Sequence, residues 1–133
     1  MTTRNKPLIL VVDDESNFIE IISTKLGSAG FDVVSASSGA EAVLQAEKLM
    51  PDLTLMDISM PGQTGTDAAL AIKQNPKTKN IKIVFLTGMS DPWPAVNGDK
   101  KKLALALGME DFIEKTEDLD SIVDKVRSVL TRN

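Results

Sequence analysis

Five polar residues stand directly after short apolar runs, and their side chains are of types that do chemistry. The runs are rich in Val, Ile and Leu, and the polar residues that follow are Asp13, Asp14, Asp57, Thr87 and Lys115. If each run is a strand and the strands are parallel neighbours, these side chains gather at one edge of a sheet, where open α/β sheets bind ligands. Three carboxylates, a hydroxyl and an ammonium group at such an edge indicate a site for a divalent cation and a phosphoryl group.

The segments that must position these residues alternate between strand and helix patterns. Continuous apolar runs predict strands at residues 8–12, 31–36, 53–56, 81–86 and 110–114. Apolar residues at helical spacing predict helices near 16–26, 38–50, 66–73, 99–108 and 119–130, the first of them capped by Ser16. Right-handed crossovers would build a doubly wound α/β fold, with helices on both faces of a five-stranded parallel sheet.

The length and composition of the chain exclude several classes of protein and of functional site. A chain of 133 residues predicts a single domain spanning 1–133, with a core at about 8–130 and no room for an output domain. The net charge of −4 argues against a nucleic-acid binder. The lack of Cys and His excludes thiol nucleophiles, disulfides and imidazole metal sites. No apolar stretch approaches the ~20 residues that span a membrane, so we expect a cytoplasmic protein.

These residues, taken together and in order, resemble the receiver domain of two-component response regulators, from about Leu8 to Leu130. The residues that carry the resemblance are the pair Asp13-Asp14, then Asp57, Met60-Pro61, Gly65, Thr87, Phe112 and Lys115. No single one of them is specific, but their joint placement at strand ends is.

The resemblance implies the flavodoxin-like strand order 2-1-3-4-5 for the sheet, and it implies a role for each matching residue. Asp57 would accept a phosphoryl group, and Lys115 and Thr87 would contact that group. Asp13, Asp14, Asp57 and the backbone carbonyl of Ser59 would hold Mg²⁺, with Mn²⁺ as an alternative. Thr87 and Phe112 would form a switch that changes a protein-binding surface.

The partners follow from the same resemblance. A stand-alone response regulator would receive the phosphoryl group from a histidine kinase or a histidine phosphotransfer protein and act on a downstream protein. It would bind neither nucleic acid nor membrane. It would catalyse only its own phosphorylation and slow dephosphorylation, and so would not be an enzyme in the ordinary sense.

Two features depart from the family pattern. Lys115 is followed by Thr116, where the family usually has a proline after a cis peptide bond. Because a cis bond before a non-proline residue costs roughly 2.5–4 kcal/mol, we expect this bond to be trans. The connection at 88–98 is longer than usual and holds the only tryptophan, Trp93. Trp93 either packs on its own domain or contacts a partner.

Other functions remain open on the sequence. Taken singly, Asp13 and Asp14 are good candidates for capping the following helix, and Lys115 is an ordinary surface charge. A degenerate receiver would bind partners without phosphorylation. A phosphatase of the haloacid-dehalogenase type would also use an aspartate nucleophile, but it needs a second acid two residues later, where this chain has Ser59.

Overall fold

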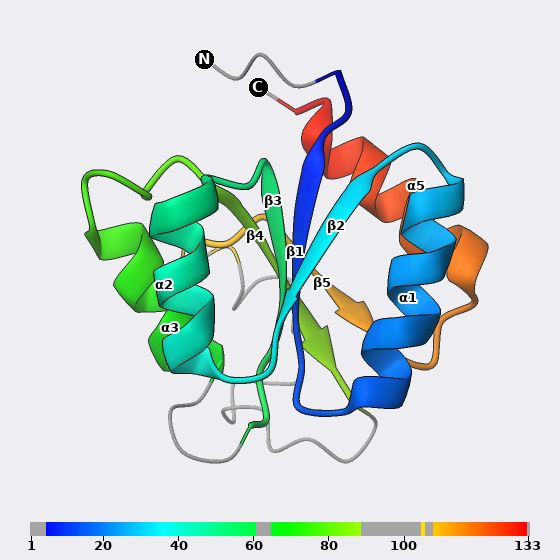
Figure 1. Ribbon diagram of the computed structural model, residues 1–133, viewed down its shortest axis with the longest axis horizontal. Coiled ribbons are helices and arrows are strands. Elements are labelled where there is room, and N and C mark those ends of the chain that lie inside the picture. The colour runs from blue at the N-terminus through cyan, green and yellow to red at the C-terminus, as the bar shows by residue number, and fades with distance from the viewer. Residues whose placement is uncertain (1–4, 61–64, 89–104, 106–107, 133) are drawn as a thin grey trace.

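The computed structural model describes residues 5–60, 65–88, 105 and 108–132. Within these residues the chain forms one parallel five-stranded sheet in the order β2-β1-β3-β4-β5, as predicted (Figure 1). The strands are β1 (Leu8–Val12), β2 (Asp32–Ala36), β3 (Leu53–Asp57), β4 (Lys82–Thr87) and β5 (Asp111–Glu114). The helices are α1 (Ser16–Ser28), α2 (Gly39–Leu49), α3 (Gly65–Gln74) and α5 (Leu119–Leu130).

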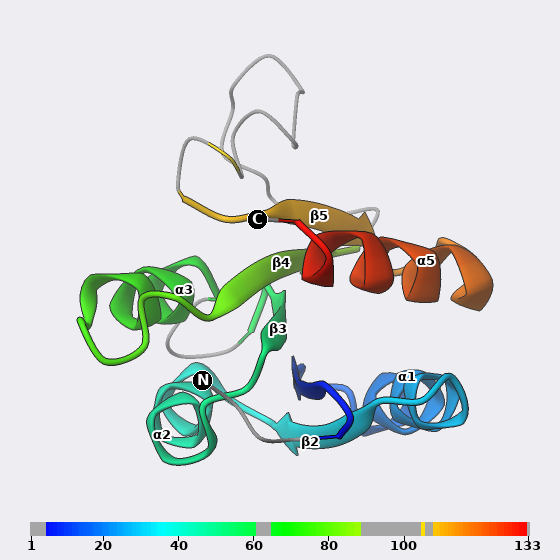
Figure 2. The ribbon, with the colours of Figure 1, turned by 90° about the horizontal axis from the view of Figure 1, so that it is seen from above.

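The helices cover both faces of the sheet, as Figure 2 shows from above. One apolar cluster packs α2 and α3 against the sheet, and a second packs α1 and α5 against the opposite face. Strands β1 and β3 lie in the middle of the sheet and are buried along their whole length. Burial on both faces explains why these strands are runs of apolar residues rather than alternating patterns.

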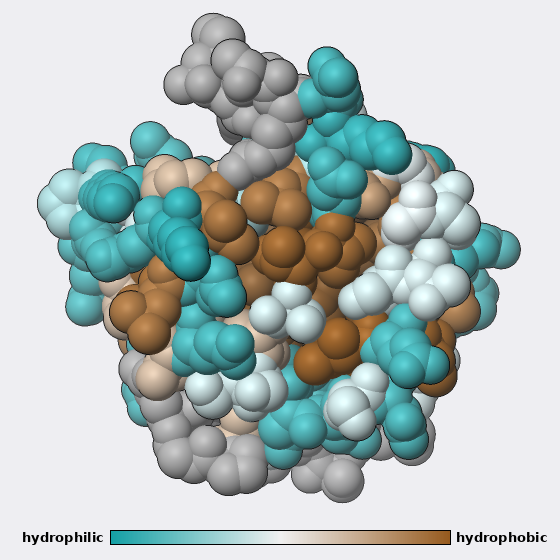
Figure 3. Space-filling view, viewed as in Figure 1, coloured by the Kyte–Doolittle hydropathy of each residue, from teal (hydrophilic) through white to brown (hydrophobic). Residues whose placement is uncertain are grey.

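Strand β2 forms an edge of the sheet and is less covered. Its residues include the half-buried Val33 and Val34 and the exposed Asp32 and Ser35. Figure 3 shows apolar surface between the two helical layers, on the face where β2 lies towards the viewer. None of the helices within the described residues has the length and apolar character needed to cross a membrane.

The predicted cap residue is right for one helix and wrong for another. Ser38 caps α2, and its hydroxyl accepts a hydrogen bond from the Glu41 N–H at 3.1 Å. Ser16 does not cap α1, because it is the first helical residue and Glu15 occupies the cap position. The Asp13 carboxylate accepts the Glu15 N–H at 2.9 Å, just before the helix begins at Ser16.

The predicted bounds of β1 and α5 match the structure, and most of the remaining strand and helix boundaries differ by a residue or two. Phe31 precedes β2 instead of starting it, and β4 extends to Thr87. The predicted helix over 99–108 lies largely outside the described residues, and the segment that contains Trp93 lies wholly outside them.

Candidate functional site

The polar residues that end the strands meet at the carboxyl edge of the sheet, which is the lower edge in Figure 1. Asp57 pairs in register with Leu86, one residue before Thr87. Beyond β5 the Lys115 N–H donates to the Thr87 carbonyl at 2.8 Å. Asp13 is held beyond β1 by its own N–H, which donates to the Ala36 carbonyl at 3.1 Å. The strand ladder therefore continues to the residues that carry the polar groups.

Three carboxylates form a cluster at this edge. Asp13, Asp14 and Asp57 each offer a carboxylate oxygen within 4.8 Å of those of the other two. Asp13 and Asp57 are buried, whereas Asp14 is exposed. The Ser59 N–H donates to Asp57 Oδ1 at 3.2 Å, which fixes one oxygen of that carboxylate. The predicted acidic cluster is thus present, open to solvent on the Asp14 side.

Lys115 supplies positive charge to the cluster. Its Nζ lies 2.7 Å from Asp13 Oδ2, 2.9 Å from Glu15 Oε1 and 3.4 Å from Asp57 Oδ2. The same Nζ lies 5.1 Å from the centre of the Phe18 ring, within the range of a cation–π contact. The Lys115–Thr116 peptide bond is trans, as predicted. The lysine therefore reaches the acids without the cis bond that the family usually has.

Burial sets the protonation preferences of these groups. It raises the pKa of the Asp57 carboxyl to about 7, and the charge of Asp13 adds to the shift, against the opposing effects of the Ser59 N–H and Lys115. Burial likewise raises the pKa of Asp13, although Lys115 counteracts it. Burial alone would lower the pKa of Lys115, but its contacts with Asp13 and Glu15 raise that pKa above its ordinary value. The ammonium therefore stays charged, while Asp57 resists ionisation.

The acids fit a divalent cation. All donors in the cluster are carboxylate oxygens, which are the ligands that Mg²⁺ prefers. Two of them are buried with raised pKa values, which is the sign of negative charge that lacks sufficient compensation. A cation at this place would remove that unfavourable energy.

Thr87 brings a free donor to the same edge. The residue is buried, and its Oγ1 has no hydrogen-bond partner among the described residues. A buried hydroxyl without a partner is costly and calls for an explanation. A phosphoryl oxygen on the neighbouring strand end would be a suitable acceptor.

Gly65 is required by the close approach of α3 to the site. A Cβ atom at Gly65 would overlap the backbone carbonyl of Asp57 and crowd the Cα of Ile58. The Gly65 N–H also donates to the Ile58 carbonyl at 3.4 Å. The first residue of α3 thus packs directly on the backbone that carries the central aspartate.

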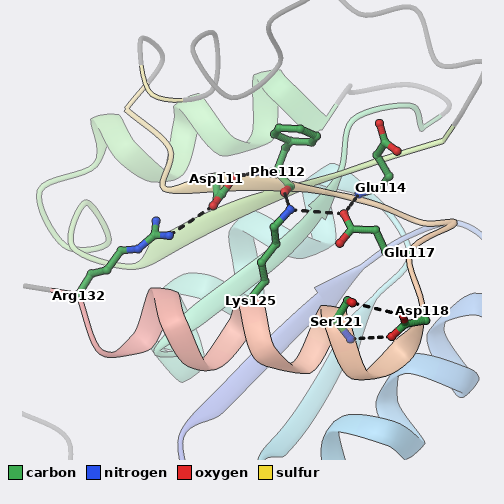
Figure 4. A network of polar contacts seen from close by, with 8 residues as sticks. All are labelled: Asp111, Phe112, Glu114, Glu117, Asp118, Ser121, Lys125 and Arg132. Atoms are coloured by element: carbon green, nitrogen blue, oxygen red, sulfur yellow. Dashed lines mark hydrogen bonds and ion pairs between the residues drawn. The ribbon is translucent and has the colours of Figure 1, made fainter.

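Phe112 belongs to a polar network that joins β5 to α5 (Figure 4). Lys125 Nζ donates to the Phe112 carbonyl at 3.2 Å and to Glu117 Oε2 at 3.4 Å, and it lies 5.1 Å from the centre of the Phe112 ring. Glu117 also accepts the Glu114 N–H at 2.9 Å. The half-buried Phe112 side chain packs against the cluster under α2 and α3. Phe112 is therefore tied to α5 through its backbone and to the other face through its ring.

Sequence reasoning missed Glu15. Its carboxylate joins Lys115 across a separation of 100 residues. The only signal was a third acid directly after Asp13-Asp14, and the spacing alone did not indicate its partner. Of the other expected residues, Asp13, Asp14, Asp57, Thr87 and Lys115 share one edge of the sheet. The carbonyl ligand expected from Ser59 stays a prediction, and Trp93 lies outside the described residues.

Known proteins share both the sequence pattern and the fold. The sequence model of the response regulator receiver domain family matches residues 9–127 of the chain. The chain is 33% identical over 127 residues to the probable transcriptional regulator ycf27 of Porphyridium aerugineum, covering 96% of this chain and 49% of that protein. It is 33% identical over 125 residues to the DNA-binding response regulator MtrA of Mycobacterium tuberculosis, covering 94% of this chain and 51% of MtrA.

The fold of this chain is also similar to that of a solved receiver-like structure. The chemotaxis protein CheY4 of Vibrio cholerae is 25% identical, with a TM-score of 0.80 over 93% of this chain and 98% of CheY4. The chain spans about half the length of the curated relatives it matches. Its matched residues include every strand and the acidic edge described above, and the chain belongs to the response regulator receiver domain family.

Proposed function

We propose that this receiver domain accepts a phosphoryl group on Asp57 from a phosphohistidine donor, in a reaction that depends on Mg²⁺. The observation that carries the proposal is the arrangement around Asp57. This buried carboxylate lies in one cluster with Asp13 and Asp14 and beside the Lys115 ammonium. Asp57 ends β3, which pairs with β4, and β4 ends in Thr87, whose hydroxyl has no hydrogen-bond partner within the part of the chain that the structure describes.

The chemistry is an exchange of phosphorus–nitrogen for phosphorus–oxygen bonding. A carboxylate oxygen of Asp57 attacks phosphorus, and the bond between phosphorus and the donor's imidazole nitrogen breaks, with its electron pair left on that nitrogen. Both reactants are anionic, so their approach is opposed by repulsion. Mg²⁺, when bound, neutralises that repulsion. Asp13, Asp14 and Asp57 would hold the ion, with the Ser59 carbonyl as a further ligand.

Two side chains of the neighbouring strands act on the phosphoryl group. Lys115 offers its ammonium to a phosphoryl oxygen in place of one of its present carboxylates, and Thr87 donates its hydroxyl. The movement of Thr87 towards the phosphoryl group opens space on β4 that Phe112, on β5, can fill. Because Phe112 has no hydroxyl, this switch is a change of packing. It would alter a protein-binding surface near β5 and α5.

The donor would be a histidine kinase or a histidine phosphotransfer protein, acting in the cytoplasm. The output would be a contact with another protein, and the chain would catalyse only its own phosphorylation and slow dephosphorylation. A second output is favoured by the relatives, which are about twice as long and are named as transcriptional or DNA-binding regulators. On that reading the receiver would control a DNA-binding module rather than contact DNA itself.

The test measures phosphorylation directly. The protein is incubated with Mg²⁺ and acetyl phosphate, and the intact mass is recorded with and without excess chelator. We expect one added phosphoryl group, which is lost in chelator and absent from Asp57→Asn. Asp32→Asn is the matched control, because Asp32 is an exposed acid at the opposite end of a strand.

The results of this experiment distinguish a receiver that is phosphorylated on Asp57 from one that is not. Labelling of Asp57→Asn, or labelling in full chelator, would refute the assignment of Asp57 and of the metal. A wild-type protein that takes up no phosphoryl group from acetyl phosphate or a phosphohistidine donor would instead be a receiver that binds partners without phosphorylation.

A further inference from the structure

Lys115 is shared unequally among three carboxylates. An ammonium group has three protons to donate, and Lys115 Nζ has three carboxylates around it. It lies nearer to Asp13 at 2.7 Å and Glu15 at 2.9 Å than to Asp57 at 3.4 Å. The resting lysine is therefore drawn towards the two acids between β1 and α1, away from the residue that would carry the phosphoryl group.

The three carboxylates differ in how readily they release the lysine. The side chains of Asp13 and Asp57 are 0% and 2% exposed, whereas that of Glu15 is 65% exposed. Asp13 is also held by its hydrogen bond from the Glu15 N–H. Asp13 and Asp57 are thus enclosed, while the Glu15 carboxylate can rotate into solvent at little cost, as expected for an exposed ion pair.

The difference in exposure matters because Lys115 must release one carboxylate before it can contact a phosphoryl group. Because Lys115 Nζ lies beside three carboxylates at rest and donates a hydrogen bond to Glu15 at 2.9 Å, a phosphoryl oxygen gains close contact with the ammonium by displacing one of these partners. Glu15 is the partner that leaves most easily. Its neighbour in α1, Phe18, flanks the same ammonium and limits the directions in which Lys115 can move.

We propose that Glu15 is a positioning residue that holds Lys115 in a resting place and yields it to the incoming phosphoryl group. The inference rests on the proposed function of Asp57. Glu15 would then slow phosphorylation and act as a brake on the site. Exposed ion pairs of this kind correspond to about two- to five-fold in an equilibrium or rate constant.

The first measurement is the rate of phosphorylation by acetyl phosphate at saturating Mg²⁺. Glu15→Gln should react about two- to five-fold faster than wild type. Glu20→Gln is the control, because it makes the same change of charge at an exposed position within α1, and it should react at the wild-type rate. An unchanged or slower rate for Glu15→Gln would overturn the inference.

A double variant shows whether the effect passes through Lys115. In a Lys115→Met background, which reacts slowly, adding Glu15→Gln should leave the rate unchanged, since the lysine that Glu15 restrains is gone. An acceleration as large as in the wild-type background would show direct repulsion of the anionic donor by Glu15, and the positioning role would be wrong.

A second measurement needs neither metal nor phosphoryl donor. In metal-free protein with ¹³C-labelled lysine, Glu15→Gln should shift the Lys115 side-chain resonance, assigned with Lys115→Arg, and Glu20→Gln should not. A Lys115 resonance that ignores Glu15→Gln would refute the contact. If Glu15→Gln shifts the Lys115 resonance but the wild-type protein takes up no phosphoryl group, the proposed function is refuted and the resting contact of Glu15 and Lys115 stands.

Discussion

Asp57 occupies a position that is unfavourable for a charged group in the metal-free protein. Its side chain is 2% exposed, and burial together with the charge of Asp13 raises its pKa to about 7 from an ordinary value of 3.8. The folded protein therefore binds this proton more tightly than the unfolded chain does. The resulting stability is fully present below about pH 4 and is lost as the pH rises towards 7.

Asp57→Asn should consequently stabilise the metal-free protein at about pH 8 by roughly 1–3 kcal/mol. The gain should shrink towards zero at about pH 3, where Asp57 is largely protonated in both states because its ordinary pKa is 3.8. Urea unfolding in excess chelator at the two pH values measures this difference. Equal stability of the two proteins at the higher pH would contradict the raised pKa.

Two buried threonines outside the site give a matched comparison. The Thr54 hydroxyl lies in the middle of β3 without a hydrogen-bond partner among the described residues. The equally buried Thr78 donates its hydroxyl to the Ile72 carbonyl at 2.6 Å. Thr54→Val should raise the free energy of unfolding by about 1 kcal/mol, and Thr78→Val should lower it by about 1–2 kcal/mol.

Urea unfolding of both variants decides this comparison. The two substitutions remove the same atom from similarly buried residues, so an opposite sign follows only from the hydrogen bond. Loss of stability in Thr54→Val would mean that its hydroxyl has a partner.

The residues of the site could be named from the sequence because each has a distinctive type at a predictable place, the end of an apolar run. Asp13, Asp57, Thr87 and Lys115 needed only the rule that parallel strands end together. Glu15 could not be named in this way, because its contact depends on the side-chain rotamers of residues 100 positions apart.

Among the elements, α3 is the one set most closely against the site. Its first residue, Gly65, packs on the carbonyl of Asp57 with no space for a Cβ atom. Gly27, near the end of α1, has no atom within 4 Å of the place where a Cβ would stand. The surroundings of Gly65 and Gly27 therefore differ, although both glycines lie in helices.

Gly65→Ala should lower the free energy of unfolding by about 1–3 kcal/mol, because the backbone of Asp57 and Ile58 must shift. Gly27→Ala should raise it by about 0.5–1 kcal/mol, through the better helix propensity of alanine. Thermal unfolding measures both changes. Amide chemical shifts at Asp57 and Ile58 should move in Gly65→Ala only, and unperturbed shifts there would show that the close packing is wrong.

Strands and helices were predictable as elements, but their ends were less so. The buried strands β1, β3 and β4 are mostly apolar, and the hydrophobic pattern alone identifies them. The cap of α1 was mispredicted, since Glu15 takes the cap position and its N–H donates to Asp13, two residues upstream. Such local side-chain bonds compete with the helix pattern and are hard to rank from sequence.

At the scale of the whole molecule, the sheet separates two edges with different roles. The carboxyl edge holds the acids and Lys115, whereas the amino edge holds the end of α5. There Lys82 Nζ donates to the Val129 carbonyl at 2.8 Å, and Arg132 donates to the Glu110 carbonyl at 3.1 Å and pairs with Asp111 at 3.4 Å. These contacts attach the last turn of α5 to the starts of β4 and β5.

The whole fold was predictable because alternating strands and helices, short connections and right-handed crossovers leave few arrangements. The anchors of α5 were not predictable, since Lys82 and Arg132 look like ordinary surface charges in the sequence. Most of their partners are backbone carbonyls, which carry no signature in the residue types, and Arg132 also pairs with Asp111.

The separation of the two edges has a practical consequence for building sensors. Residues before β1 and after α5 leave the domain at the amino edge, on the far side of the sheet from Asp57 (Figure 1). A fluorescent reporter joined at either place would therefore stand clear of any donor protein that approaches the carboxylates. Its signal would then follow movements that α5 transmits along its length, without physically obstructing the entrance to the site.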